Sequence, residues 1–180
     1  MLYFITGNEK KFGEVKLMLP GVLQLDIDLP EIQSTDGKKI VEAKLMEAVK
    51  YHEGEFIVKD TGLYLKGLNG LPGPFIKWFL DKLGTEGVYR LAEKIGIFEA
   101  EAKAVVGYLN KNKEIHFFEG IIEGELVPPR GEKIFGWDPI FKPKGDDRTF
   151  SEMSREEKNE ISHRRVAIAR LKDYLDRMKN

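Results

Sequence analysis

Cysteine is absent from the 180 residues of this chain. Disulfide bonds, thiolate metal sites and cysteine nucleophiles are therefore excluded. Only three histidines occur, His52, His116 and His163, and they share no spacing typical of a zinc site. A metal ion bound by this protein is therefore expected to be a hard cation held by carboxylates.

Long apolar runs and an excess of charge of one sign are missing as well. No apolar stretch approaches the roughly 20 residues that cross a bilayer, so no membrane partner is expected. The net charge is −1, which provides no global basic field for binding nucleic acid. Because an apolar run already begins at Leu2, we expect no signal peptide and a cytoplasmic protein.

Hydrophobic residues nevertheless make up 42% of the chain, enough for the core of a single domain covering residues 1–180. Apolar patterns predict strands at 2–5, 22–28, 56–58, 63–65, 98–109 and 113–127. They predict helices at 9–19, 37–52, from 75 onward, 85–95 and 162–178, with loops at 67–74 and 128–150. This order predicts an α/β fold with a mixed central sheet, a long hairpin and a cleft between two lobes.

The first candidate site segment is Thr6-Gly7-Asn8, which lies between the first predicted strand and the first predicted helix. Backbone N–H groups at a helix N-terminus attract phosphate oxygens, and Lys10 and Lys11 add positive charge. The spacing is not that of a Walker A loop. The alternative is an ordinary helix cap followed by solvated lysines.

The second candidate segment is Phe135-Gly136-Trp137-Asp138-Pro139. Its aromatic rings are suited to stacking on a purine, and Asp138 is suited to accept a hydrogen bond from a ring N–H. Gly136 would keep such a platform open. The alternative is an aromatic loop packed into the core, with Asp138 as a turn residue.

The third candidate segment runs from Glu157 to Arg165, where a polar stretch precedes the last helix. Ser162 is placed to cap that helix, and His163 and Arg164 would project from its first turn. Arg164 offers a planar fork of donors for a carbonyl or a phosphate, and Lys158 is interpreted as a mobile point charge. The alternative is a solvated helix start with ordinary charges.

Two carboxylates follow predicted strands, Glu31 after the second and Asp60 after the third. Strand ends face the ligand crevice in α/β sheets, so this pair is suited to hold Mg²⁺ together with substrate phosphates. One of the two is also suited to orient or deprotonate a water. The alternative is that each is a simple turn acid.

Taken together, these segments resemble the inosine triphosphatase family, the house-cleaning nucleoside triphosphate pyrophosphohydrolases. The resemblance covers nearly the whole chain. It is carried by Thr6-Gly7-Asn8-x-Lys10-Lys11, Leu29-Pro30-Glu31-Ile32-Gln33, Asp60-Thr61-Gly62-Leu63, Gly70-Leu71-Pro72-Gly73-Pro74, Phe135-Gly136-Trp137-Asp138-Pro139 and Glu157-Lys158-Asn159-x-x-Ser162-His163-Arg164.

The resemblance implies an enzyme that hydrolyses ITP, dITP and XTP to the monophosphate and pyrophosphate, with Mg²⁺ and as a homodimer. It implies metal ligands at Glu31 and Asp60, with Asp60 also accepting a proton from the attacking water. The remaining implied residues bind substrate: Thr6, Gly7, Asn8, Glu9, Lys10, Lys11, Lys44, Thr61, Phe135, Gly136, Trp137, Asp138, Lys158, His163 and Arg164.

One position departs from the family pattern, which often has two consecutive acids where this chain has Lys59-Asp60. Neighbouring strand residues alternate between faces, so Lys59 and Asp60 need not share a site. We therefore expect Glu31 and Asp60 to suffice for the metal.

Two other classes of function stay open at the level of sequence. A nucleotide-binding regulatory module without turnover would need the phosphate and base segments but not the two acids. An RNA-binding protein would use Arg164, Arg165 and Arg170 on the last helix, against the neutral net charge. Exposed apolar surface for a dimer is predicted at Phe75, Trp78 and Phe79, with core packing of these residues as the alternative.

Overall fold

The computed structural model describes residues 1–132 and 136–178. Its seven-stranded sheet has the order β2-β1-β3-β5-β6-β7, with β4 paired to β3. β1 pairs in parallel with β2 and β3, whereas β3–β4 and β6–β7 are antiparallel. The strands are β1 (Leu2–Ile5), β2 (Leu23–Leu25), β3 (Glu55–Leu65), β4 (Pro72–Gly73), β5 (Glu99–Leu109), β6 (Ile115–Leu126) and β7 (Phe141–Pro143).

Five helices are described, together with two short 3₁₀ turns. They are α1 (Glu9–Met18), α2 (Gly37–Ala48), α3 (Ile76–Ile95), α4 (Arg155–Ile161), α5 (His163–Met178), η1 (Lys66–Leu68) and η2 (Asp138–Ile140). The predicted α/β fold with a mixed sheet and a long hairpin is confirmed. None of the helices in the described part of the chain has the length and apolar character that crossing a membrane requires.

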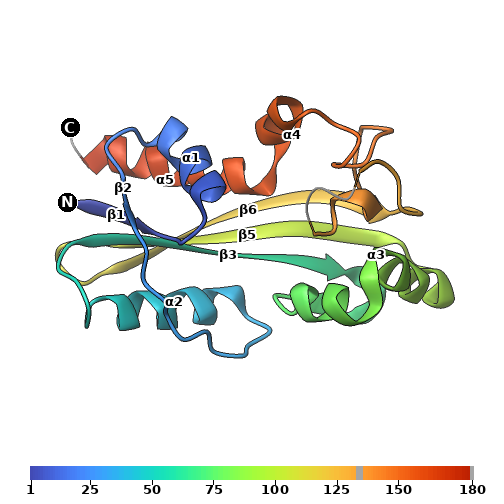
Figure 1. Cartoon of the computed structure of the whole chain (residues 1–180), viewed down its shortest axis with the longest axis horizontal. Coiled ribbons are helices and arrows are strands. Elements are labelled where there is room, and N and C mark those ends of the chain that lie inside the picture. Colours follow the sequence, from blue (N-terminus) through green and yellow to red (C-terminus); the bar gives the residue numbers. More distant parts are fainter. Residues whose placement is uncertain (133–135, 179–180) are drawn as a thin grey trace. The chain divides into compact units, whose positions relative to one another are not determined.

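The chain divides into two compact units, and the first comprises residues 1–60, 104–119 and the segment from Val166 onward. Side chains of its strands alternate between two apolar clusters. Phe4 and Ile57 pack against α1 and α5, whereas Tyr3 and Phe56 pack against α2. Helices therefore cover both faces of these strands, with α1 and α5 on one side and α2 on the other (Figure 1).

The second unit comprises residues 61–103 and 120–165. Its core joins Leu63 and Leu65 of β3 to Ile76 and Val88 of α3. Aromatic residues from the segment after β6 complete it, namely Trp137, Phe141 and Phe150. This unit therefore places a site segment directly on its core.

The third predicted strand is longer than expected, and the prediction that Lys59-Asp60-Thr61-Gly62 closes it is wrong. β3 runs through these residues to Leu65. Gly62 indicated a turn, but its role is close approach: a Cβ there would lie 2.6 Å from the backbone carbon of Gly73 in β4. Glycine within a strand commonly marks such an approach.

Other boundaries differ from the prediction as well. β2 is limited to Leu23–Leu25 because polar residues follow it. α2 ends at Ala48 instead of residue 52 because the chain tightens, with Lys50 N donating to Glu47 O at 3.0 Å. The predicted loop at 128–150 contains η2 and β7, which are too short for a periodic signal.

Candidate active site

The turn after β1 has the geometry predicted for a phosphate-binding helix start. Asn8 caps α1, since its Oδ1 accepts from Lys11 N at 3.0 Å, and Asn8 N donates to Thr6 Oγ1 at 3.2 Å. Glu9 and Lys10 form the exposed start of the first helical turn, where backbone N–H groups point out of the helix. The capping alternative is thus part of the structure, and it coexists with a helix N-terminus open to an anion.

Contacts with β2 hold this turn in place. Thr6 N donates to Leu25 O at 3.1 Å, and Gln24 Nε2 donates to Thr6 O at 3.0 Å. Asp26 lies directly against the turn, because a Cβ on Gly7 would come within 2.7 Å of Asp26 Oδ1. Gly7 therefore leaves room for the Asp26 carboxylate. Asp26 was not predicted as a neighbour of the site, because nothing in its sequence position links it to the turn.

Lys44 and Glu31 are brought together in the same unit. Lys44 Nζ lies 3.0 Å from Glu31 Oε1, and Glu31 is the more exposed of the two. Lys44 is carried by α2, whose N-terminus is capped by Asp36 Oδ1 accepting from Lys38 N at 2.9 Å. The two residues predicted for substrate and metal therefore form an ion pair with each other.

Asp60 does not end a strand, so the argument that placed it at a strand end is wrong. It is half-buried inside β3, and its alternation matches Phe56 and Val58, which face α2. Glu31 contacts α2 through Lys44, so both proposed metal ligands belong to the α2 side of the sheet. Within residues 1–132 and 136–178, no group of three or more His, Asp or Glu side chains is placed to hold a metal ion.

In the second unit, Asp138 and Lys158 form a buried ion pair between Lys158 Nζ and Asp138 Oδ2. Asp138 is 5% exposed and Lys158 9% exposed, so the interpretation of Lys158 as a mobile charge is wrong. Lys158 Nζ also lies 5.5 Å from the centroid of the Phe150 ring. Phe150 is a further residue that the sequence analysis missed, because its position 8 residues before Lys158 has no helical or strand periodicity.

α4 and α5 position the third segment. A capping box starts α4, with Ser154 Oγ accepting from Glu157 N at 3.1 Å and Glu157 Oε2 accepting from Ser154 N at 2.8 Å. Ser162 caps α5 as predicted, since its Oγ accepts from Arg165 N at 3.2 Å. His163 and Arg164 are both buried. The alternative of a solvated helix start is therefore wrong for these two side chains.

For Trp137, the alternative interpretation of the aromatic segment as a loop packed into the core is confirmed. Trp137 is buried in the core of the second unit, with its ring centroid 6.2 Å from that of His163. Gly136 is exposed and has a φ of 39°, a conformation that favours glycine. Thr61 is half-buried in β3, and Phe135 lies outside the described residues.

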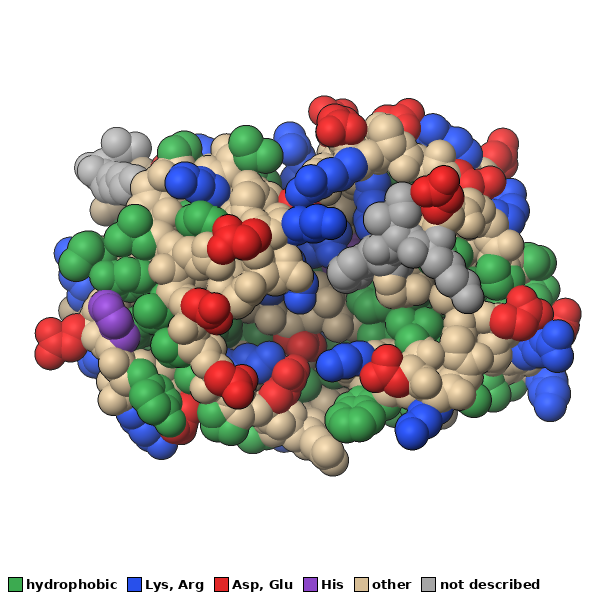
Figure 2. Space-filling model, in the orientation of Figure 1, with side chains coloured by type: hydrophobic (Ala, Val, Ile, Leu, Met, Phe, Trp, Pro, Cys, Tyr) green, Lys and Arg blue, Asp and Glu red, His purple; other side chains and the backbone are tan. Residues whose placement is uncertain are grey.

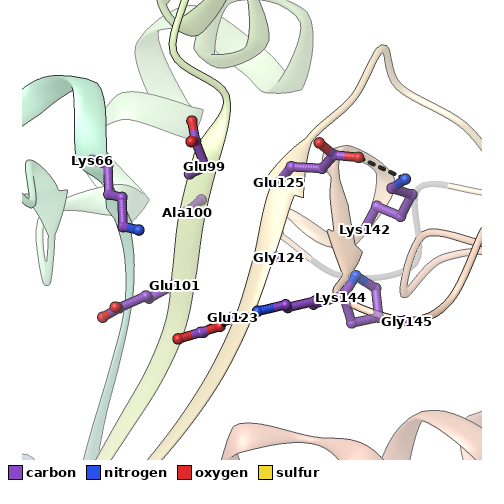
Figure 3. Close-up of a pocket in the computed structure, with 11 residues that line it drawn as sticks. Lys66, Glu99, Ala100, Glu101, Glu123, Gly124, Glu125, Lys142, Lys144 and Gly145 are labelled. Atoms are coloured by element: carbon purple, nitrogen blue, oxygen red, sulfur yellow. Dashed lines mark hydrogen bonds and ion pairs between the residues drawn. The ribbon is translucent and has the colours of Figure 1, made fainter.

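Two hollows lie away from all of these residues. A cavity of about 330 Å³ in the second unit is lined by β5, β6 and β7 (Figure 3). Two of its lysines are paired with two of its carboxylates, Lys142 with Glu125 at 2.6 Å and Lys144 with Glu123 at 3.1 Å. A hollow of about 700 Å³ in the first unit borders the starts of β1 and β3. Neither is lined by a predicted site residue.

Comparisons with known proteins identify the family. The model of the Ham1 family matches residues 2–174. The inosine triphosphate pyrophosphatase of Schizosaccharomyces pombe is 43% identical over 183 residues, covering 99% of this chain and 97% of the relative. The enzyme of the same name from Puccinia graminis is 40% identical, covering 98% and 97%.

Solved structures agree with these relatives. The Ham1 protein of Staphylococcus aureus has a TM-score of 0.85 at 29% identity, with 98% of each chain covered. A nucleoside-triphosphatase described as a dITP/XTP pyrophosphatase, from Mycobacterium abscessus, has a TM-score of 0.77 at 26% identity, covering 95% of this chain and 98% of that one. By sequence over nearly its whole length and by fold, this chain belongs to the Ham1 family.

Proposed function

We propose that this protein hydrolyses the non-canonical purine nucleoside triphosphates ITP, dITP and XTP to the monophosphate and pyrophosphate, and so removes them from the nucleotide pool. The observation that carries the proposal is the 43% identity, over 99% of the chain, to an inosine triphosphate pyrophosphatase. A full-length match supports a shared reaction more strongly than a match to one segment.

The first unit supplies the residues for the triphosphate. Thr6, Gly7 and Asn8 present backbone and side-chain groups at the start of α1, and Lys10 and Lys11 add charge in its first turn. The remaining residue of this turn, Glu9, contributes its backbone N–H. Lys44 leaves its partner Glu31 to contact phosphate oxygens. These donors neutralise the charge that develops on the triphosphate during the reaction.

Mg²⁺ is the proposed cofactor. Glu31 and Asp60 belong to the same side of the sheet and offer oxygen donors, which Mg²⁺ prefers. Two carboxylates fit an ion that takes its other ligands from substrate phosphates and water. When bound, such an ion polarises phosphate oxygens and orients the triphosphate.

Asp60 is the proposed proton acceptor. The oxygen of a water molecule forms a bond to the α-phosphorus while the bond from that phosphorus to the bridging oxygen breaks, and pyrophosphate leaves with the electron pair. Asp60 takes the proton released by the water. Its half-buried place inside a strand fixes the carboxylate before substrate binds.

The second unit supplies the residues for the base. Hypoxanthine and xanthine have a donor at N1 and an acceptor at O6, whereas adenine reverses both. Asp138 accepts a hydrogen bond from N1–H, and Arg164 donates one to O6. Adenine leaves these buried polar groups without partners, which lowers kcat/KM for ATP relative to ITP by up to about 10⁴–10⁵. Lys158 offsets the cost of burying the Asp138 charge. Phe135, Gly136, Trp137 and His163 frame the base, and Thr61 contacts the substrate.

All 180 residues form one catalytic domain, and the protein acts in the cytoplasm as a homodimer. Trp78 supports the dimer, because it is 59% exposed and so does not fit the core-packing alternative. Phe75 and Phe79 beside it are half-buried. Neither nucleic acid nor membrane is a proposed partner. Both acidic and basic side chains occur on the face shown in Figure 2.

The test is a panel of ITP, dITP, XTP, GTP and ATP with Mg²⁺, scored separately for pyrophosphate and for inorganic phosphate. We expect pyrophosphate from the first three and little from ATP. In ¹⁸O-labelled water, the label should appear in the monophosphate, as attack at the α-phosphorus requires. Nucleotide binding without pyrophosphate release would instead favour the non-catalytic module.

A further inference from the structure

Lys59 occupies a defined place on the face of the sheet that α1 covers. Its Nζ lies 5.7 Å from the centroid of the Phe4 ring, and Phe4 is buried in the cluster beneath α1 and α5. Alternation along β3 agrees, because Ile57 belongs to the same cluster. Lys59 therefore lies on the side opposite to the one assigned to Asp60.

The strand register brings Lys59 level with the phosphate-binding turn. Phe4 pairs with Ile57 in the parallel ladder of β1 and β3. Two residues further along each strand, Lys59 is level with Thr6, where β1 has ended and the turn into α1 begins. The Lys59 ammonium therefore lies on the face of the sheet that α1 covers, level with the N-terminal end of that helix.

Asp26 lies on the other side of the same turn. Thr6 N is bonded to Leu25 O in β2, and the Asp26 carboxylate packs against Gly7. A carboxylate this close opposes the binding of a polyanion through charge repulsion. A cation on the opposite flank offsets that repulsion, and β3 provides one at Lys59.

We propose that Lys59 binds the β- and γ-phosphates of the substrate, the part that leaves as pyrophosphate. This inference rests on the proposed function. Asp60 acts at the α-phosphorus from the α2 side, while the turn at Thr6–Asn8 holds the triphosphate on the side where Lys59 lies. A lysine ammonium is a point charge with three donors, which suits it to bind phosphate oxygens.

The experiment measures binding of magnesium pyrophosphate to the full chain by calorimetry, so no turnover is needed. Lys59→Met removes the charge and keeps an unbranched stem over Phe4, whereas Lys59→Arg keeps the charge. Lys16→Met is the matched control, because Lys16 Nζ lies 5.4 Å from the Phe12 ring centroid but in the last turn of α1, away from the phosphate end. Thermal melting confirms that each variant folds, and Lys59→Gln replaces Lys59→Met if the latter does not.

We expect Lys59→Met to weaken pyrophosphate binding about tenfold or more, the scale of a lost charge-assisted hydrogen bond. Lys59→Arg should stay within about threefold of the wild type, and Lys16→Met within about twofold. Unchanged binding in Lys59→Met, or equal losses in the Lys59→Met and Lys16→Met variants, would overturn the proposal, as would a wild-type protein that does not bind pyrophosphate. A wild type that binds pyrophosphate but releases none from ITP refutes the proposed function alone.

Discussion

The two residues that precede Asp60 in β3 face opposite sides of the sheet. Val58 packs toward α2, while Lys59 lies over Phe4 on the other face. By strand alternation, the consecutive side chains of Lys59 and Asp60 are therefore assigned to opposite faces of the sheet. The acid–base role of Asp60 remains the role proposed above from the family resemblance.

Replacing Asp60 with Asn is expected to lower kcat for ITP by about 10²–10⁴, because the amide cannot accept the proton of the attacking water. Steady-state pyrophosphate release measures the effect. Thermal melting checks that the Asp60→Asn variant is folded. A variant with near wild-type turnover would remove Asp60 from this role.

The buried pair of Asp138 and Lys158 should show strong coupling in stability. Removing one member leaves a buried charge with its main partner gone, which costs about 3–5 kcal/mol. We expect Lys158→Met and Asp138→Leu each to lower the free energy of urea-induced unfolding by this amount, and the double variant to lose less than the sum. Strictly additive losses would contradict the interpretation of the two side chains as one unit.

Some site residues could be predicted from the residues next to them in the sequence, whereas others could not. The turn at Thr6–Asn8 and the cap at Ser162 follow from signals within a few residues, so the sequence located both. The pair of Asp138 and Lys158 joins residues 20 positions apart, and the position of Asp26 depends on which strand lies beside β1. Such contacts are set by tertiary structure and leave no periodic signal.

At the scale of secondary structure, glycines decide how closely elements pack. Gly107 in β5 lies beneath α2, and a Cβ there would come within 2.3 Å of Val41 Cγ1 and 2.9 Å of Leu45 Cδ1. Gly13 in α1 is the contrasting position, since nothing lies within 4 Å of its missing Cβ. The two residues look alike in the sequence and differ only in their surroundings.

Gly107→Ala is expected to lower the free energy of unfolding by about 1–3 kcal/mol through overpacking against α2. Gly13→Ala should raise it by about 0.5–1 kcal/mol, because alanine loses less backbone entropy in a helix. Urea titrations of both variants measure the difference. Equal effects of the two substitutions would show that the contact with α2 is not tight.

The segment around the start of α4 should make stability depend on acid. The hydrogen bond from Ser154 N–H, followed by one from Arg148, lowers the pKa of Glu157 from its ordinary 4.5. A lowered pKa means that the folded state binds the proton less readily than the unfolded state. The stabilisation is therefore complete above about pH 4.5 and is lost as pH falls through the lower folded value. Melting temperatures measured below this pH should fall less steeply for Glu157→Gln than for the wild type, and identical slopes would contradict the assignment.

Helices and long strands were predictable, whereas β3 shows where the sequence misleads. The apolar periodicity of residues 9–19 and 163–178 and the hairpin of β5 and β6 are local patterns. The polar run from Lys59 to Gly62 resembles a turn in isolation. It stays extended because β4 pairs with Leu63 and Tyr64 and because Gly62 admits the backbone of Gly73.

At the scale of the whole molecule, exposed apolar side chains bear on whether copies of the chain assemble. Trp78 is exposed on α3, and Leu83 of the same helix is 46% exposed. Exposed apolar surface on a folded protein can mark a site that binds another protein. A second copy of this chain is the partner that the family resemblance implies.

Trp78→Asp is expected to convert a dimer into a monomer at micromolar concentration, because a charge in a buried interface is costly. Sedimentation equilibrium measures the mass. Leu17→Asp is the control, since Leu17 is 83% exposed on α1 and should leave the mass unchanged. A monomeric wild type, or a Trp78→Asp variant with the wild-type mass, would exclude this surface.

Because Asp60 lies within a continuous strand, the length of the chain around it cannot vary. One residue inserted between Asp60 and Leu63 would turn Leu63 and Leu65 from the core of the second unit to the opposite face. A deletion would do the same. Homologous enzymes of this family should therefore tolerate insertions in the exposed turn between β5 and β6, which holds no proposed site residue, but none along this strand.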